Sequence, residues 1–271
     1  MSAYLAVVAM RYQMLLQYRA AALAGFVTQF FWGAIKLMVL AAFLAASSRE
    51  QPMSWAEIVA YVWLGQALLG LLPWNVDPEI QEKFTTGAVA YELLRPLDLY
   101  FFWYARTLAF RMATTTLRAM PMLVVALFVL PLVGLAEWQL APPPSWASTV
   151  WFFASLAATV LLATACTMVM HISLYWTISG RGITVAAGGI VPVLCGLTVP
   201  LPLFPDWAQT FLYWQPLRGL ADTPFRIYSG HIAPAEAAPE IALQLAWTVV
   251  IVLCGRALLR RAQRSLVVQG G

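Results

Sequence analysis

The chain has 271 residues, of which 62% are hydrophobic and only 10% are charged. Soluble globular domains usually carry about 25% charged residues, so this composition argues against a water-soluble enzyme and indicates that the bilayer is the main solvent. Intrinsic disorder is excluded because it requires low hydrophobicity and a high net charge, whereas the net charge here is +4.

Residues 1–20 are predicted to form an amphipathic helix that lies in the membrane interface. Its polar residues, such as Arg11 and Gln13, fall mostly away from the apolar face. The alternative is that this segment simply extends the first membrane-spanning helix. The apolar residues that recur at helical spacing are Leu5, Val8, Ala9, Tyr12, Leu15 and Leu16.

Six apolar segments are predicted to cross the membrane. A helix needs about 20 apolar residues to span about 30 Å of hydrocarbon, and helices satisfy their own backbone polar groups in lipid. We therefore expect an all-α polytopic membrane protein with a single transmembrane domain over residues 1–271. The fifth span has the least definite limits because prolines crowd its end. The predicted spans are 21–46, 57–77, 112–136, 147–172, 183–204 and 240–260.

Basic residues predict how these spans are oriented, because short cytoplasmic loops carry an excess of Lys and Arg. Twelve of the 16 basic residues fall at the termini and in the loops on the same side, or at the base of the third span. The opposite side has only Arg49, Arg218 and Arg226. Both termini are therefore expected in the cytoplasm. The positive balance is explained by topology, so no nucleic-acid partner is expected.

The connection after the second span, residues 77–94, is predicted to form a short amphipathic helix. Ile80, Phe84, Ala88 and Tyr91 recur at helical spacing and form one apolar stripe. Such a helix can rest on lipid headgroups or insert its apolar face into a groove of another protein. Its charges are mixed in sign, which argues mildly against adsorption on headgroups. The neighbouring charged residues are Glu79, Glu82, Lys83, Glu92 and Arg95.

Lys36 and Arg118 lie within predicted spans and Arg111 lies directly before the third span, and charge at such positions is a functional-site hypothesis by default. Lys36 lies in the outer half of the first span, so its side chain either reaches the outer interface or faces a pathway. Arg111 and Arg118 are seven residues apart and share one helix face. They either extend to lipid phosphates or line a wet intracellular cavity.

The end of the fifth span and the region that leads to the sixth are rich in proline and in aromatic residues, and they include Pro192, Pro200, Pro205 and Pro216. Broken backbone at membrane depth has to be buried in protein or line a cavity. We therefore expect a re-entrant turn followed by short external helices that cover a central cavity.

Sequence signatures of catalysis are missing. The chain has no G-x-x-x-x-G-K-[ST] phosphate-binding loop and no H-E-x-x-H zinc motif, so neither an enzyme nor a resident metal or cofactor is expected. Ser179-Gly180 is only faintly similar to an intramembrane serine protease, because Thr177 stands where that motif needs glycine. Two alternatives stay open: a carrier that works without ATP, and an intramembrane enzyme or scaffold.

The pattern as a whole resembles the membrane (permease) subunit of ABC transporters of the type-2, or type V, exporter class. The resemblance covers nearly the full length. It includes Gly87 followed by Tyr91-Glu-Leu-Leu-Arg-Pro-Leu97, and an outer segment with Gly196, Pro200-Leu-Pro-Leu-Phe-Pro205, Gln215-Pro216 and Gly219.

This resemblance implies a bacterial cytoplasmic-membrane exporter with two permeases, identical or paralogous, above two ATPase subunits that carry ATP and Mg. Residues 77–94 would be the coupling helix, with Ile80, Phe84 and Ala88 in a groove of the ATPase. An apolar interior would suit a hydrophobic or amphipathic cargo, whose identity does not follow from the sequence. The other residues expected at this contact are Glu79, Glu82, Lys83, Tyr91, Glu92 and Arg95.

Overall fold

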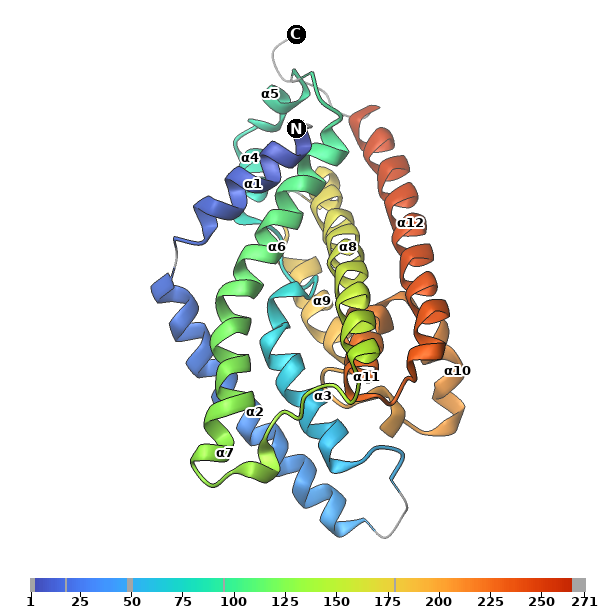
Figure 1. Cartoon of the computed structure of the whole chain (residues 1–271). Helices are drawn as coiled ribbons and strands as arrows, with labels where there is room; N and C mark the ends of the chain where they lie inside the picture. The colour runs from blue at the N-terminus through green and yellow to red at the C-terminus, as the bar shows by residue number, and fades with distance from the viewer. Residues whose placement is uncertain (1–2, 18, 48–50, 95, 178, 265–271) are drawn as a thin grey trace.

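The computed structural model describes residues 3–17, 19–47, 51–94, 96–177 and 179–264, and this part of the chain forms helices joined by loops, without strands. Helices α1 (Ala3–Leu15), α4 (Pro78–Thr85) and α5 (Val89–Leu93) lie at one end, beside the last turns of α12 (Figure 1). We call this the terminal end. Helices α7 (Leu130–Leu132), α10 (Asp206–Trp214) and α11 (Asp222–Ser229) lie toward the opposite end.

Four helices of the described residues are long and apolar enough to cross a membrane. This finding agrees with a multi-pass membrane protein, and it supports four of the six predicted spans. Each of these helices is longer than its predicted span. They are α2 (Arg19–Ala46), α6 (Leu99–Val124) with its continuation to Leu132, α8 (Trp146–Thr177) and α12 (Pro234–Arg264).

The third of the predicted spans begins thirteen residues earlier than expected, at Leu99 rather than at residue 112. The Asp98 carboxylate accepts a hydrogen bond from the backbone N–H of Phe101 at 3.1 Å and so caps the helix. Arg256 adds an ion pair to Asp98 at 3.4 Å. The aromatic run that follows Leu99 is therefore part of the helix itself.

The second predicted span is shorter than expected, because α3 (Trp55–Ala67) ends ten residues before residue 77. Ser54 and Glu57 cap its start reciprocally, and its residues from Ile58 to Ala67 are all buried. After Ala67 the chain forms one 3₁₀ turn, Leu69–Leu71. Gly70 and Pro73 both disfavour a continuing helix.

Arg111 compensates for this break. Its guanidinium donates to the carbonyl oxygens of Gly70 (3.2 Å) and Asn75 (3.1 Å), and to Thr167 Oγ1 (3.2 Å). The side chain is only 2% exposed. Backbone outside a regular helix is tolerated at membrane depth when protein groups satisfy it. Arg111 therefore fixes the irregular segment after α3 against α6 and α8.

We expect Arg111→Met to lower the free energy of unfolding by about 3 kcal/mol, because two buried carbonyl groups lose their donor. Denaturant titration of the purified protein in mixed micelles measures this loss. Arg118→Met is the matched control, since Arg118 is only half-buried on the same helix. Equal losses in the two variants would contradict the role assigned to Arg111.

Proline also shapes the end of α6. A π-helical turn, Val125–Val129, precedes α7, and Pro131 cannot donate to Leu127 O four residues earlier. That oxygen instead accepts from Gln139 Nε2 at 2.9 Å, and Ala126 O accepts from Leu140 N at 3.0 Å. The loop after α7 is thus fastened to the freed carbonyl groups of the helix.

The fifth predicted span, 183–204, is also shorter in the structure than expected. Helix α9 (Arg181–Leu194) ends after 14 residues, and the chain turns at Gly196, whose φ is +87°. A side chain at Gly196 would collide with the Tyr61 hydroxyl. Lys36 Nζ donates to Leu197 O at 2.6 Å just beyond the turn. A turn η4 (Leu201–Leu203), α10, a turn η5 (Pro216–Leu220) and α11 follow.

Candidate functional site

The charged connection after α3 forms two helices rather than the single predicted helix over 77–94. Asp77 caps α4 by accepting a hydrogen bond from Glu79 N at 2.9 Å, and Pro78 occupies the first helical position. Gly87, with φ of +73°, separates α4 from α5. This left-handed conformation favours glycine and ends the first helix.

Ion pairs fasten the two helices to the rest of the terminal end. Arg11 of α1 contacts Asp77 at 3.1 Å and Glu79 at 2.7 Å. Arg106 of α6 contacts Glu79 at 2.5 Å and Glu92 at 3.5 Å. Together with Lys83, which pairs with Glu92, these residues form what we call the terminal ion network. It connects α1, α4, α5 and α6.

Glu92 is the most enclosed carboxylate of the terminal ion network, at 3% exposed. It accepts hydrogen bonds from Lys83 and from the indole N–H of Trp103. Burial by itself raises the pKa of Glu92, but these hydrogen bonds and the charges of Lys83 and Arg106 hold the pKa below its usual range. Glu92 is therefore a buried anion stabilised by several donors.

The pKa of Glu79 is lowered for the same reasons. Burial opposes ionisation, and the hydrogen bonds and charges of Arg11 and Arg106 outweigh it. Asp77 extends the connection to α8, because its backbone N–H donates to His171 Nε2 at 3.1 Å. The start of α4 is thus attached to two long helices, α6 and α8.

The apolar stripe of α4 faces inward. Ile80 is fully buried, and the Phe84 ring contacts Tyr175 and Trp103 edge-on at centroid distances of 4.7 and 5.8 Å. The predicted placing of Ile80 and Phe84 in a groove of a partner is therefore replaced by packing within this chain, because α6 and α8 already cover that face. Ala88 is half-buried between the two short helices.

A different set of side chains faces outward. Tyr91 is 74% exposed and Leu94 is 81% exposed, although both are large and apolar. Beside α4, a shallow groove of about 400 Å³ is lined by Val76, Pro78, Gln81, Glu82 and Thr85. We call this surface the outer face of α4–α5. Arg95 lies outside the described residues.

Of Lys36, Arg111 and Arg118, the structure brings Arg111 and Arg118 close together. Arg111 and Arg118 line the same small cavity of about 100 Å³, beside Gly70 and Asn75. Lys36 lies elsewhere: it belongs to α2, and its Nζ atom contacts the turn after α9. The Lys36 ammonium group binds Leu197 O and does not extend to the outer interface, because this acceptor is available within the chain.

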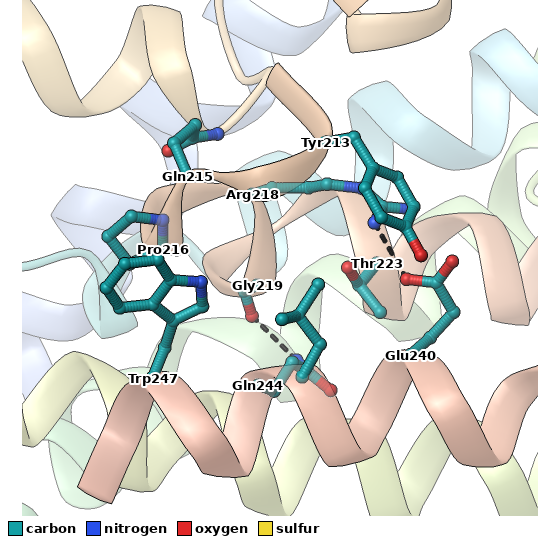
Figure 2. A pocket seen from close by; sticks show the side chains of 10 residues that line it. Tyr213, Gln215, Pro216, Arg218, Gly219, Thr223, Glu240, Gln244 and Trp247 are labelled. Carbon is teal, nitrogen blue, oxygen red and sulfur yellow. Dashed lines mark hydrogen bonds and ion pairs between the residues drawn. The ribbon is translucent and has the colours of Figure 1, made fainter. Parts of the chain in front are cut away.

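A second buried charge cluster lies toward the opposite end. Asp222 is fully buried; it accepts from Tyr61 Oη at 2.8 Å and pairs with Arg218 at 3.0 Å and with Arg226 at 3.4 Å. Arg218 also pairs with Glu240 of α12 at 2.7 Å, as Figure 2 shows. We call this group the Asp222 cluster. It joins η5 and α11 to α3 and α12.

Hydrogen bonds of Gln244 reinforce the same junction. Gln244 Nε2 donates to Gly219 O at 2.8 Å (Figure 2), and Gln244 Oε1 accepts from Ser155 Oγ of α8 at 2.9 Å. A side chain at Gly219 would press against Leu162 and Gln244, so glycine permits this close approach. The segment between α9 and α12 is therefore held to three helices.

Sequence reasoning missed several residues of both clusters. In the sequence, Arg11 is a polar residue of the N-terminal helix and Arg106 is one of the basic residues that indicate topology, and neither has a carboxylate within one helical turn. Arg218 and Asp222 carried a usable signal, since opposite charges four residues apart pair on a helix and the surrounding segment is apolar. Asp77 is the first residue of the predicted segment 77–94, and the sequence alone gives it no partner.

Comparisons with known proteins give one match. A family model described as an ABC-2 family transporter protein matches residues 30–270. Searches among curated proteins and solved structures found no match.

Proposed function

Because the chain belongs to the ABC-2 family of transporter membrane proteins, we propose that it is the permease subunit of an ATP-driven exporter. In this proposal it forms half of the translocation pathway, beside a second permease that is identical or paralogous. Two separate ATPase subunits bind and hydrolyse ATP with Mg, since this sequence has no phosphate-binding loop. The family match over residues 30–270 is the observation that carries the proposal.

The ATPase would bind at the terminal end, on the outer face of α4–α5. Two exposed apolar side chains at the edge of a charged segment are suited to a protein interface, where buried apolar anchors supply most of the affinity. Tyr91 and Leu94 are such side chains. This assignment places the terminal end, and with it both termini, in the cytoplasm of a bacterium, in agreement with the basic residues counted on that side.

The terminal ion network would then carry movement of the ATPase into the membrane. The outer face of α4–α5 belongs to short helices whose inner sides are joined to α1 and α6 by ion pairs and to α8 by Asp77 and His171. A displacement of α4 by rigid-body closure of the ATPases would therefore shift several helices together.

The second permease would pack on α9. Only Val191 of this helix is buried, and a Cβ atom at Gly182, Gly188 or Gly189 would meet nothing within 4 Å. Small residues at a membrane-helix interface let two backbones approach closely. Lys36 and Arg118 are proposed to border the pathway between the two permeases, where a charge is tolerated in contact with water. Arg111, which is only 2% exposed, would border it through the small cavity that it lines with Arg118.

Leu94→Asp tests the contact with the ATPase. We expect the variant to bring down at least about tenfold less of a co-expressed ATPase subunit, because a charged side chain is placed where an apolar anchor is buried. Transport-coupled ATP hydrolysis in proteoliposomes should fall in parallel. The melting temperature should stay within the range of the parent protein, since Leu94 is exposed in the isolated chain.

Leu94→Met serves as the matched control and should retain the ATPase. Full binding by Leu94→Asp would disprove this docking surface. Transport driven by an ion gradient in the absence of any ATPase would disprove the exporter proposal as a whole and would favour the carrier instead.

A further inference from the structure

A large apolar cavity lies between α3, the end of α6, α8 and α11, and none of its lining residues belongs to either charge cluster. Its volume is about 490 Å³, which falls within the range of small-molecule sites. Its walls include Leu64, Leu127, Phe128, Phe153, Pro142 and Tyr228. Phe128 and Phe153 are each 62% exposed on helices long enough to span a membrane. The cavity therefore opens sideways, toward the acyl chains of the bilayer.

Hydrogen bonds and ring packing hold the walls of this cavity in place. The loop that supplies Pro142 is fastened to α6 by the hydrogen bonds of Gln139 and Leu140 to the carbonyl groups freed near Pro131. On the far side, Tyr228 packs edge-on against Phe152 of α8 at a centroid distance of 5.1 Å. A preformed cavity binds without the cost of ordering its own walls.

A second, polar cavity of about 260 Å³ adjoins the first. Pro142 and Tyr228 line both cavities. On α3, Ala60 lines the polar cavity, and Leu64, one helical turn later, lines the apolar cavity. Among the described residues that line the polar cavity, Glu57 is the one charged side chain. Its carboxylate is held in place by Ser54 N at 2.6 Å and by His231 Nδ1 at 2.8 Å.

We propose that the two cavities together bind one amphiphile, with its alkyl chain in the apolar cavity and a cationic nitrogen beside Glu57. The apolar lining matches a hydrocarbon chain. A carboxylate and an aromatic ring that line the same cavity, here Glu57 and Tyr228, suit an ammonium group by charge and by cation–π attraction. Such a molecule is either an ethanolamine-type lipid or a cationic amphiphile without phosphate. Binding requires neither the ATPase nor a second permease.

Photolabelling of the full-length chain in phosphatidylglycerol nanodiscs tests this site. Hexadecyltrimethylammonium and hexadecanoate, each with a diazirine at the same position of the chain, are compared at pH 8. We expect the ammonium probe to label cavity-lining peptides preferentially. Glu57→Gln should remove that preference without abolishing the labelling by hexadecanoate.

A second part of the photolabelling test fills the apolar cavity with a larger side chain. Leu127→Trp should reduce labelling of these peptides about tenfold, because the indole occupies the space of the alkyl chain. Val124→Trp is the matched control: Val124 lies on the same helix, is 52% exposed and does not line the cavity. Leu156→Trp fills the cavity from α8 and should act like Leu127→Trp, so that misfolding of one variant does not decide the result.

A lysophosphatidylethanolamine probe with the same chain identifies the source of the ligand. Labelling as strong as that by the ammonium probe identifies a lipid headgroup, whereas weaker labelling identifies a cationic amphiphile without phosphate. Equal labelling by all probes that Leu127→Trp leaves unchanged would show ordinary contact with bulk lipid and would overturn the site. Since the permease is studied alone, failure here would leave the proposed role in ATP-driven export untouched.

Discussion

Replacing Glu92 by alanine is expected to lower the free energy of unfolding by about 3–5 kcal/mol, because Lys83 loses the carboxylate that it pairs with and the buried Arg106 keeps only Glu79. Glu92 is 3% exposed and Arg106 is 6% exposed, so water does not readily take its place. Trp103 would lose its hydrogen-bond acceptor at the same time. Denaturant titration in mixed micelles measures the loss. Transport-coupled ATP hydrolysis should also fall, since α5 would no longer be held to α6.

The same carboxylate predicts how stability responds to acid. The folded-state pKa of Glu92 is below its ordinary value, which is about 4.3. Its contribution to stability is therefore fully present above about pH 4.3 and is lost as the pH falls through the lowered pKa. Glu92→Gln should show a weaker acid dependence than the parent protein, while keeping an acceptor for Trp103.

Glu82→Ala is the control for Glu92→Ala, because Glu82 is exposed on the neighbouring helix. Exposed substitutions away from special features usually change stability by less than about 0.5 kcal/mol. A similar loss in both variants would mean that removing any negative charge from this segment weakens the protein. The loss of stability would then not depend on the specific contacts of Glu92.

The long helices were predictable from the sequence, whereas the short ones were not. Runs of apolar residues reveal a span because the bilayer requires a minimum length, and α2, α8 and α12 contain the predicted segments. The early ends of α3 and α9 depend on contacts between distant residues. Arg111 stabilises the break after Ala67 from 41 residues away, and Lys36 binds the turn after α9 from 161 residues away.

That residues 77–94 contact a partner stays a prediction, and the sequence could not assign the faces of this segment. Periodicity shows that Ile80 and Phe84 share a face, and it is silent on whether a partner or the chain itself covers that face. Here Trp103 and Tyr175 cover it. What remains for a partner is the outer face of α4–α5, where Tyr91 was one of the predicted contact residues and Leu94 was not.

A loss of comparable size is expected at the opposite end for Asp222→Ala. The side chain is fully buried, and its removal leaves Arg218 with Glu240 as the remaining ion-pair partner and deprives the Tyr61 hydroxyl of its acceptor. Breaking a buried ion pair by removing one partner costs about 3–5 kcal/mol. Because the Asp222 cluster joins η5 and α11 to α3 and α12, we also expect local opening of residues 196–233.

Limited proteolysis and hydrogen exchange of the purified chain separate these two effects. Faster cleavage and exchange confined to residues 196–233 would show that Asp222 fastens this segment, whereas uniform acceleration would indicate a purely global loss. Asp206→Ala is the control, because Asp206 is exposed at the start of α10. Asp222→Asn keeps an oxygen acceptor for Tyr61 but loses the charge that pairs with Arg218. Its stability should therefore lie between those of the parent and Asp222→Ala, and full stability would show that the ion pair adds nothing to the hydrogen bond.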